Sequence, residues 1–168
     1  MLGKLAFAAS LVLAAPSAEA ITVRWTATLD QAQEVPTPVP VPGASGSAFG
    51  TIDTETGLLA WNLAFSGLSA PPVAAHFHAP GARGVTAPVF VDIGAISGLN
   101  SPSIGSTTIA LAAAQQLLDG LFYINVHTAL NPSGEIRGQV APIPLPAALP
   151  LAVAACALLG GLALRRRA

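Results

Sequence analysis

Two stretches of this chain alternate apolar and polar residues with a period of two, and this pattern restricts the fold more than any other feature. The apolar positions are Val23, Trp25, Ala27 and Leu29 in the first stretch, and Leu59, Trp61, Leu63 and Phe65 in the second. Successive side chains of a strand point to opposite faces, so each stretch predicts a strand with one buried face. We therefore expect Trp25, Trp61 and Phe65 in the core.

Further short strands are predicted between turn and loop signals. Together with 21–29 and 58–65 they cover residues 46–53, 73–78, 89–93, 122–127 and 135–141. Proline- and glycine-rich loops separate them, residues 98–108 are polar, and the one convincing helical stretch lies near 109–119. About seven short strands of this kind predict an all-β fold, an antiparallel Greek-key sandwich or barrel.

The first twenty residues have the layout of a secretory signal peptide. Lys4 precedes a short apolar run, and Ala18-Glu19-Ala20 has the small-x-small pattern of a cleavage point. The apolar run is too short to span a bilayer comfortably. We expect cleavage after Ala20 and export of the domain; an N-terminal core helix is the alternative.

The C-terminal segment has the composition of a membrane anchor. Residues 145–164 contain no charged side chain, and Arg165, Arg166 and Arg167 follow directly. Twenty helical residues reach across a hydrocarbon core of about 30 Å, and the arginines predict that this end is cytoplasmic. The sequence thus predicts a signal peptide at 1–20, a domain at 21–142 and a C-terminal sorting signal or transmembrane anchor at 143–168.

The order of features in this tail resembles the VPLPA-type PEP-CTERM sorting signals of Gram-negative bacteria. The matching residues are Ile143, Pro144, Leu145, Pro146 and Ala147, followed by the apolar segment and the arginines. Ile143 stands where that signal usually has valine. The resemblance implies an inner-membrane anchor, processing near Pro-Leu-Pro-Ala by an exosortase-type protease, and a final place at the cell surface or in the extracellular matrix. A plain tail anchor has the same topology.

The charge of the chain excludes some classes of protein. Charged residues make up 9% of the sequence and the net charge is −1, so the basic stripe of a nucleic-acid-binding protein is missing. The hydrophobic fraction of 52% excludes a disordered polar chain. Residues 21–144 carry three arginines and seven acidic residues, a net charge of −4. Cys156 lies in the apolar tail, so the exported domain has neither a disulfide nor a cysteine-rich zinc module.

The three histidines are the candidate metal ligands. His76 and His78 are two positions apart on a predicted strand and share a face, while Phe77 points the opposite way. His127 alternates with Asn125 on another predicted strand. Three imidazoles form a recognised ligand set for copper or zinc, provided that these strands are neighbours. The alternative is that each ring only hydrogen-bonds a loop carbonyl.

Other candidate chemistry is sparse. The domain has no Gly-x-Ser-x-Gly elbow, no thiol and no paired carboxylates at a recognisable spacing, so nucleophilic catalysis has little support. Glu135 and Arg137 share a strand face by the period of two and are expected to form an ion pair with each other or with loop neighbours.

Four blocks of the sequence resemble the CHRD domain, first described in chordin. They are LDQAQEVP at 29–36, AAHFH at 74–78, YINVHT at 123–128 and PSGEIRGQ at 132–139. The blocks follow the family's order and extend over about residues 23–141, with Phe77 where an aliphatic residue is usual. Bacterial members stand alone or beside sorting signals, so chordin's growth-factor antagonism is not carried over.

The order of the histidine blocks and the Gly-Glu-Ile-Arg-Gly segment is also similar to copper,zinc superoxide dismutase. This similarity implies copper ligands at His76, His78 and His127 and an anion-guiding Arg137. The chain lacks that family's bridging histidine, zinc ligands and disulfide. The leading hypothesis is therefore a non-enzymatic envelope or matrix protein that binds a partner or a metal, and the alternative is a copper-dependent oxidoreductase.

Overall fold

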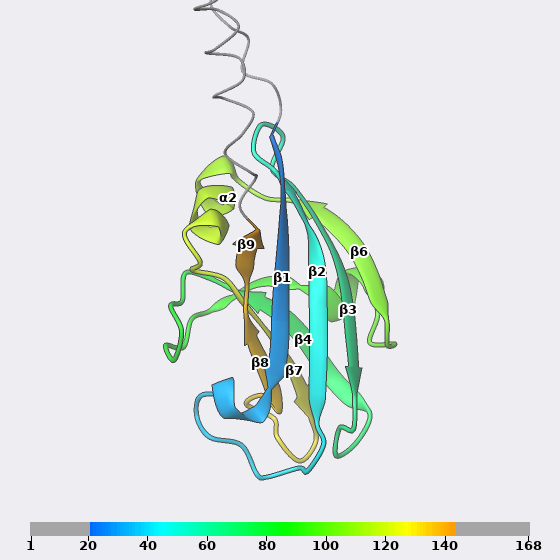
Figure 1. Ribbon diagram of the computed structural model, residues 1–168. Helices are drawn as coiled ribbons and strands as arrows, with labels where there is room; N and C mark the ends of the chain where they lie inside the picture. The colour runs from blue at the N-terminus through cyan, green and yellow to red at the C-terminus, as the bar shows by residue number, and fades with distance from the viewer. Residues whose placement is uncertain (1–20, 144–168) are drawn as a thin grey trace, which may run out of the picture.

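Residues 21–143 are described by the structure, a computed structural model, and they form an almost entirely β domain (Figure 1). The strands are β1 (Thr22–Asp30), β2 (Ser45–Asp53), β3 (Leu58–Ser66), β4 (Pro72–His78), β5 (Val89–Asp92), β6 (Ser103–Thr108), β7 (Tyr123–Thr128), β8 (Ile136–Gln139) and β9 (Ala141–Ile143). The helical elements are α1 (Ile93–Ser97), α2 (Leu111–Leu118) and a 3-10 turn at Gln31–Gln33. The predicted all-β class and the helix near 109–119 are confirmed.

The strands of the described residues belong to one curled antiparallel sheet. Its order is β5-β4-β7-β8-β1-β2-β3-β6, and β9 pairs with β1 beside β8. The predicted closing strand 135–141 is therefore divided into β8 and β9. Figure 1 shows β1, β2, β3 and β6 in front of β4, β7 and β8. The curl turns the inner faces of these two halves toward each other, and the core lies between them.

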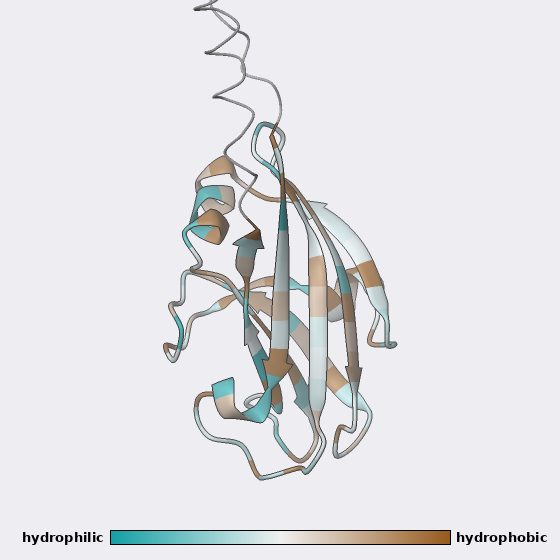
Figure 2. Ribbon diagram, in the orientation of Figure 1, coloured by the Kyte–Doolittle hydropathy of each residue, from teal (hydrophilic) through white to brown (hydrophobic). Residues whose placement is uncertain are grey.

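The centre of the core is aromatic. Phe77 of β4 makes edge-on contacts with Trp25 and Trp61, at 5.7 and 5.6 Å between ring centroids, and Phe122 lies 6.4 Å away. Trp25 and Trp61 are buried as predicted, and Phe65 is partly buried against the same cluster. Bands of apolar and polar residues alternate along β1 and β2 (Figure 2). The period-two pattern therefore predicted which face of each long strand is buried.

The elements α1 and β6 were not predicted, and they lie together at the open side of the curled sheet. Helix α1 packs against both β4 and β6. The Trp61 indole N–H donates to Ser97 Oγ of α1 at 3.1 Å, and that hydroxyl lies 2.7 Å from Ser103 Oγ of β6. A Cβ at Gly105 would lie 2.7 Å from the Trp61 ring, so β6 needs glycine beside the indole. Because β6 consists mostly of glycine, serine and threonine, its sequence shows no alternation of apolar and polar residues, and the strand was not predicted.

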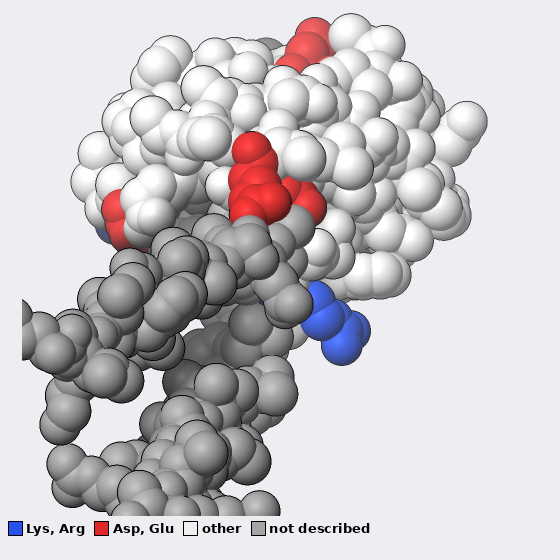
Figure 3. Space-filling view, turned by 90° about the horizontal axis from the view of Figure 1, so that it is seen from above, with Lys and Arg blue, Asp and Glu red and all other residues white. Residues whose placement is uncertain are grey.

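The two ends of the described chain lie side by side. Arg24 of β1 pairs with Ile143 of β9, and the β2–β3 turn with Asp53 and Glu55 lies at the same end. Seen from that end, the described surface is mostly uncharged, with a few acidic groups and a basic side chain at its edge (Figure 3). The predicted signal segment 1–20 and the tail beyond Ile143 lie outside the described residues. Within 21–143, no helix is long and apolar enough to cross a membrane.

Candidate metal centre

The outer face of β4, β7 and β8 carries a row of polar side chains. The register pairs His76 with Asn125, and Asn125 with Arg137. Along β7, Asn125 and His127 are two positions apart and share this face, while the intervening Val126 belongs to the core. Strands β4 and β7 are thus neighbours, which is the condition on which the predicted histidine cluster depended.

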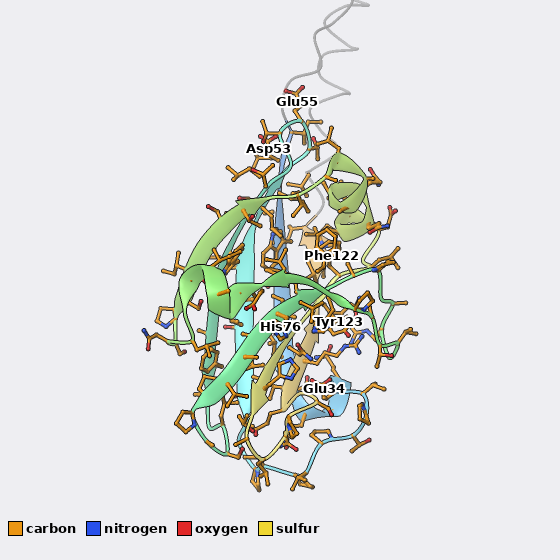
Figure 4. The ribbon with its side chains drawn as sticks, turned by 180° about the vertical axis from the view of Figure 1, so that it is seen from behind. Glu34, Asp53, Glu55, His76, Phe122 and Tyr123 are labelled. Atoms are coloured by element: carbon orange, nitrogen blue, oxygen red, sulfur yellow. The ribbon has the colours of Figure 1, made fainter. Side chains whose placement is uncertain are left out.

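The structure brings the three histidines together on this outer face. Each ring offers one nitrogen, and the three nitrogens lie within 4.8 Å of one another. The Nδ1 atom of His76 is 3.1 Å from Nε2 of His127. His78 and His127 are buried and His76 is half-buried. In Figure 4, His76 lies in the middle of the domain with Tyr123 and Glu34 nearby.

Backbone carbonyls fix the protonation of two of the rings. Nδ1 of His78 lies 2.8 Å from the carbonyl oxygen of Ala87, and Nδ1 of His127 lies 3.0 Å from that of Pro132. A carbonyl oxygen only accepts hydrogen bonds, so each Nδ1 donates its proton and each Nε2 keeps a lone pair. Histidines that bind metals commonly donate their second ring N–H in this way.

The two Nε2 lone pairs point toward the cluster, and that of His78 has no donor to satisfy it. Nε2 of His78 is buried and makes no hydrogen bond. Nε2 of His127 faces the Nδ1 atom of His76 and, at 2.9 Å, the Oδ1 atom of Asn125. An unsatisfied buried acceptor costs about 1–3 kcal/mol, so this arrangement is unfavourable unless a cation meets it. The donor set thus fits a metal ion that prefers nitrogen ligands.

Burial keeps two of these imidazoles neutral. It lowers the pKa of His78 and of His127, against the raising effect of the hydrogen bonds to Ala87 and Pro132, and the neighbouring imidazoles lower both values further. Only neutral imidazole binds a metal. The two rings therefore stay competent to bind at a lower pH than a free histidine would.

A stack of side chains holds the ring of His78 in place. The His78 ring lies parallel to the ring of Tyr123, at 4.8 Å between centroids and 3° between planes. The guanidinium carbon of Arg137 is 3.5 Å from the centre of the same tyrosine ring. The Tyr123 hydroxyl accepts a hydrogen bond of 3.1 Å from the backbone N–H of Ala87, whose carbonyl holds Nδ1 of His78. Tyr123 was not predicted, although it alternates with Asn125 and His127 on the same face.

Arg137 holds the loop that covers the site. Its side chain is 1% exposed, and Nη2 donates to the carbonyl oxygens of Ala82 and Val85 at 3.1 and 2.9 Å. Its Nη1 atom is buried and makes no hydrogen bond. The loop of residues 79–88 is thus fastened over His78 by the arginine and by Tyr123.

Of the two partners expected for Glu135, Arg137 or loop neighbours, the structure places loop groups against its carboxylate. Its buried carboxylate accepts hydrogen bonds from the backbone N–H and hydroxyl of Ser69, from Thr128 Oγ1 at 2.5 Å and from Asn131 Nδ2 at 3.1 Å. Burial acts to raise the pKa of Glu135, but these hydrogen bonds together lower it. Glu135 therefore anchors the loop before β4 to the turn after β7.

A second buried carboxyl group, on Glu34, lies beside the site. Glu34 is 4% exposed; Oε1 accepts a hydrogen bond of 3.2 Å from the backbone N–H of Val35, and Oε2 makes none. Burial raises the pKa of Glu34 to about 7, although the Val35 N–H, Arg137 and Asn125 all act to lower it. Glu34 was not predicted as a site residue, although it lies in the segment 29–36 that resembles the CHRD domain. An acidic residue next to Val-Pro in a chain with so few charges was the available signal.

The comparisons with known proteins point to one family. The sequence profile of the CHRD domain matches residues 25–140, a span that contains the three histidines, Glu34 and Arg137. Neither the curated proteins nor the solved structures provide a match to this chain.

Proposed function

We propose that this chain, which belongs to the CHRD domain family, is an exported envelope or matrix protein that binds one transition-metal ion through His76, His78 and His127. The observation that carries the proposal is the convergence of three ring nitrogens within 4.8 Å of one another. His78 and His127 each keep a lone pair on Nε2, because Nδ1 of each ring donates to a carbonyl. An ion held this way would be bound on the outer face of the sheet, under the 79–88 loop.

Copper and zinc are the ions that this ligand set favours. Three imidazoles without a thiolate suit both metals, and Cu²⁺ binds such sites more tightly than Zn²⁺. The apolar core and the fastened loop support a preformed site, so little ordering would have to accompany binding. Copper is therefore the first metal to test.

A binding role has more support than the alternative of a copper-dependent oxidoreductase. The similarity to superoxide dismutase assigns Arg137 to guiding an anion, but this guanidinium is buried and donates to the carbonyls of Ala82 and Val85. Superoxide consumption by the copper-loaded protein, lost in His76→Ala, would favour the enzyme instead.

Export and anchoring belong to the same proposal. The signal-like residues 1–20 and the sorting-like residues 143–168 would place the domain outside the inner membrane, first anchored and then released by an exosortase-type protease. The described chain begins and ends at adjacent points, since Arg24 pairs with Ile143, and His76 lies away from this end (Figure 4). An anchor attached there would not lie over the metal centre.

Calorimetric titration with Cu²⁺ and Zn²⁺ tests the proposal on protein purified from cells that express the full chain. We expect one ion per chain, and no comparable binding in His78→Ala or His127→Ala. Asp119→Asn removes an exposed carboxylate outside the centre and should bind as the parent does. Absence of stoichiometric binding in the parent would contradict the proposal, as would equal binding by the histidine variants.

A further inference from the structure

The outward side of β1, β2 and β3, which faces the viewer in Figure 1, carries many hydroxyl groups and little charge. We call it the hydroxyl face; its exposed or half-buried hydroxyls belong to Thr26, Thr28, Ser45, Ser47, Thr51 and Ser66. We propose that this face binds a neutral polysaccharide, with the Phe49 ring as the central contact. This binding would not depend on the metal centre, because the histidines lie on β4 and β7 in the other half of the curled sheet.

The strand register places these side chains in a regular array. Along β2, every second residue from Ser45 to Thr51 points outward, over a length of about 20 Å. The pairing places Thr26 of β1 and Asn62 of β3 on either side of Phe49. Paired side chains on neighbouring strands lie about 5 Å apart. The face therefore offers hydrogen-bonding groups at short, regular intervals, which suits a polymer with repeating hydroxyl groups.

Phe49 is the large apolar side chain at the centre of this array. It is 58% exposed, and its partners in the register are a threonine and an asparagine rather than apolar residues. A sugar ring presents C–H groups on its flat sides and hydroxyl groups at its edge, and the face of an aromatic ring is electron-rich and attracts C–H groups. Phe49 would therefore contact the flat side of a sugar while the surrounding hydroxyls bind its edge.

A shallow hollow of about 380 Å³ lies at the Ser45 end of the hydroxyl face. It is lined by Ser45, Gly46, Ser47, Ala64, Phe65 and Ser66. All six residues are uncharged, and a serine hydroxyl both donates and accepts, so the serines match a sugar hydroxyl in either sense. The volume is in the range of small-molecule sites. The hollow would hold one part of the polymer, and the next part would run along β2 to Phe49.

The distribution of charge favours a neutral polymer. Strands β2, β3 and β6 contain one ionisable residue, Asp53, at the end of β2. On β1, Arg24 lies toward the same end, and the Asp30 carboxylate accepts hydrogen bonds from the backbone and side chain of Gln33. Residues 21–144 carry a net charge of −4, so an anionic polymer would be repelled by the domain without finding a cluster of cations on this face. A neutral polymer is therefore the occupant that this face complements.

A second copy of the chain and a lipid surface fit this face less well. The core of a protein interface is apolar and rich in aromatic residues. Here the large exposed apolar side chains of β2, β3 and β6 are Phe49, Leu58 and Ile104, with hydroxyl-bearing residues between them. In Figure 2, β2 and β6 are mostly pale, between the hydrophilic and the hydrophobic colours. Insertion into a membrane would bury these hydroxyls without partners, which is unfavourable.

Sedimentation with insoluble polysaccharides tests the proposal on protein purified from cells that express the full chain. The neutral probes are cellulose, chitin, curdlan and starch granules, and calcium alginate is the acidic probe. We expect at least one neutral polymer to remove the protein from solution and alginate to leave it there. Retention by none of the four neutral polymers would overturn the proposal, and so would equal retention by alginate.

Variants of Phe49 test whether the hydroxyl face is the binding surface. Phe49→Ala should lower the affinity for the retained polymer about tenfold, and Phe49→Trp should keep it because the indole also offers an aromatic face. Val73→Ala truncates a side chain of similar exposure, 57%, on β4 and should bind as the parent does. Ser47→Val keeps a strand-forming residue but removes a hydroxyl from the hollow, so it should also weaken binding.

Three results with these variants would overturn the proposal. They are parent-like binding by Phe49→Ala, an equal loss in Val73→Ala, and loss of binding when a metal chelator is added, which would move the contact to the metal centre. Urea denaturation of Phe49→Ala should match that of the parent because the ring is exposed, so that lost binding is not lost folding. Polysaccharide binding by a protein that binds no copper would leave this proposal standing and overturn only the metal site.

Two further measurements identify the other occupants. Sedimentation equilibrium should show that the parent and Phe49→Ala have the same oligomeric state. Vesicles of phosphatidylethanolamine and phosphatidylglycerol should not bind the parent through this face. A parent dimer that Phe49→Ala converts to a monomer would assign the face to a second copy, and vesicle binding that Phe49→Ala abolishes would assign it to a lipid surface. Either result would overturn the proposal.

Discussion

Burial of a carboxyl group with a pKa of about 7 makes Glu34 costly to the metal-free fold at neutral and alkaline pH. Its ordinary value is 4.5, so between pH 4.5 and 7 the folded state holds a proton that the unfolded state has released. The contribution of Glu34 to the free energy of unfolding is therefore fully present below pH 4.5 and is lost as the pH rises through 7. His78 and His127 have lowered pKa values and act in the opposite direction. Their contribution to the free energy of unfolding is lost as the pH falls below 6.5.

This sign gives a prediction for the apo protein. The free energy of unfolding of Glu34→Gln minus that of the parent should grow as pH is raised from 5 to 8, because only the parent must bury a charge. At about 1.4 kcal/mol per pKa unit, the difference should reach roughly 2–3 kcal/mol. The histidines are present in both proteins and cancel in the comparison. Urea denaturation at each pH measures the difference, and a constant difference would refute the raised pKa.

At the scale of secondary-structure elements, α1 connects the two edges that the curled sheet leaves open. Strands β5 and β6 are the ends of the strand order among the described residues, and α1 follows β5 directly. Ser97 accepts from the Trp61 indole, lies within hydrogen-bonding distance of Ser103, and donates to the Ile93 carbonyl. One hydroxyl group therefore ties this helix to both β3 and β6.

Removal of that hydroxyl should weaken the whole domain. Ser97→Ala leaves the buried Trp61 N–H without its acceptor, and we expect a loss of about 1–3 kcal/mol in the free energy of unfolding. Ser106→Ala, on the exposed face of β6, is the matched control and should change stability little. Chemical denaturation followed by tryptophan fluorescence measures the free energy of unfolding of each variant. Equal free energies for Ser97→Ala and Ser106→Ala would mean that the Ser97 hydroxyl does not stabilise the contact of α1 with β3 and β6.

The elements also show what the sequence could predict. Strands β1 and β3 were predictable because one face of each is apolar at every second position, and the same alternation placed His76 and His78 on one face. Pairing of β4 with β7, which brings in His127, depends on contacts between distant segments that a local pattern does not contain. The carbonyl groups that fix the rings come from loops, so their positions could not be predicted either.

At the scale of the whole molecule, stability of the domain depends on one aromatic core. Residues 21–143 contain no cysteine, so no disulfide restrains the unfolded state. Phe77 of β4 contacts Trp25 and Trp61 from the opposite half of the curled sheet. These rings are therefore what holds the two halves, and with them the metal centre, in one structure.

Truncation of a core ring should be far more damaging than truncation of a surface ring. Trp61 is 2% exposed, and Trp61→Ala should cost about 3–5 kcal/mol in the free energy of unfolding. Phe49 is 58% exposed on β2, so Phe49→Ala serves as an aromatic control with little expected effect. Thermal melts of both variants test this, and a Trp61→Ala protein that melts with its parent would contradict the assignment of the core.

Processing at both ends is the prediction for the complete chain. The mature protein should lack residues 1–20, and the tail beyond about Pro144, if the signal-like and sorting-like segments act as their sequences indicate. Intact mass spectrometry of protein from the producing cells measures both ends at once. Full-length chain that still carries Met1 in the cytoplasm would contradict the export proposal while leaving the metal centre untouched.

X-ray absorption at the copper edge of the loaded protein tests the metal centre most directly. The account predicts three imidazole ligands per ion, with copper–nitrogen distances of about 2.0 Å. His76→Ala, His78→Ala and His127→Ala should each reduce the imidazole signal, and Asp119→Asn should leave it unchanged. Copper coordinated mainly by oxygen, or a spectrum that the three histidine variants do not alter, would contradict the central claim.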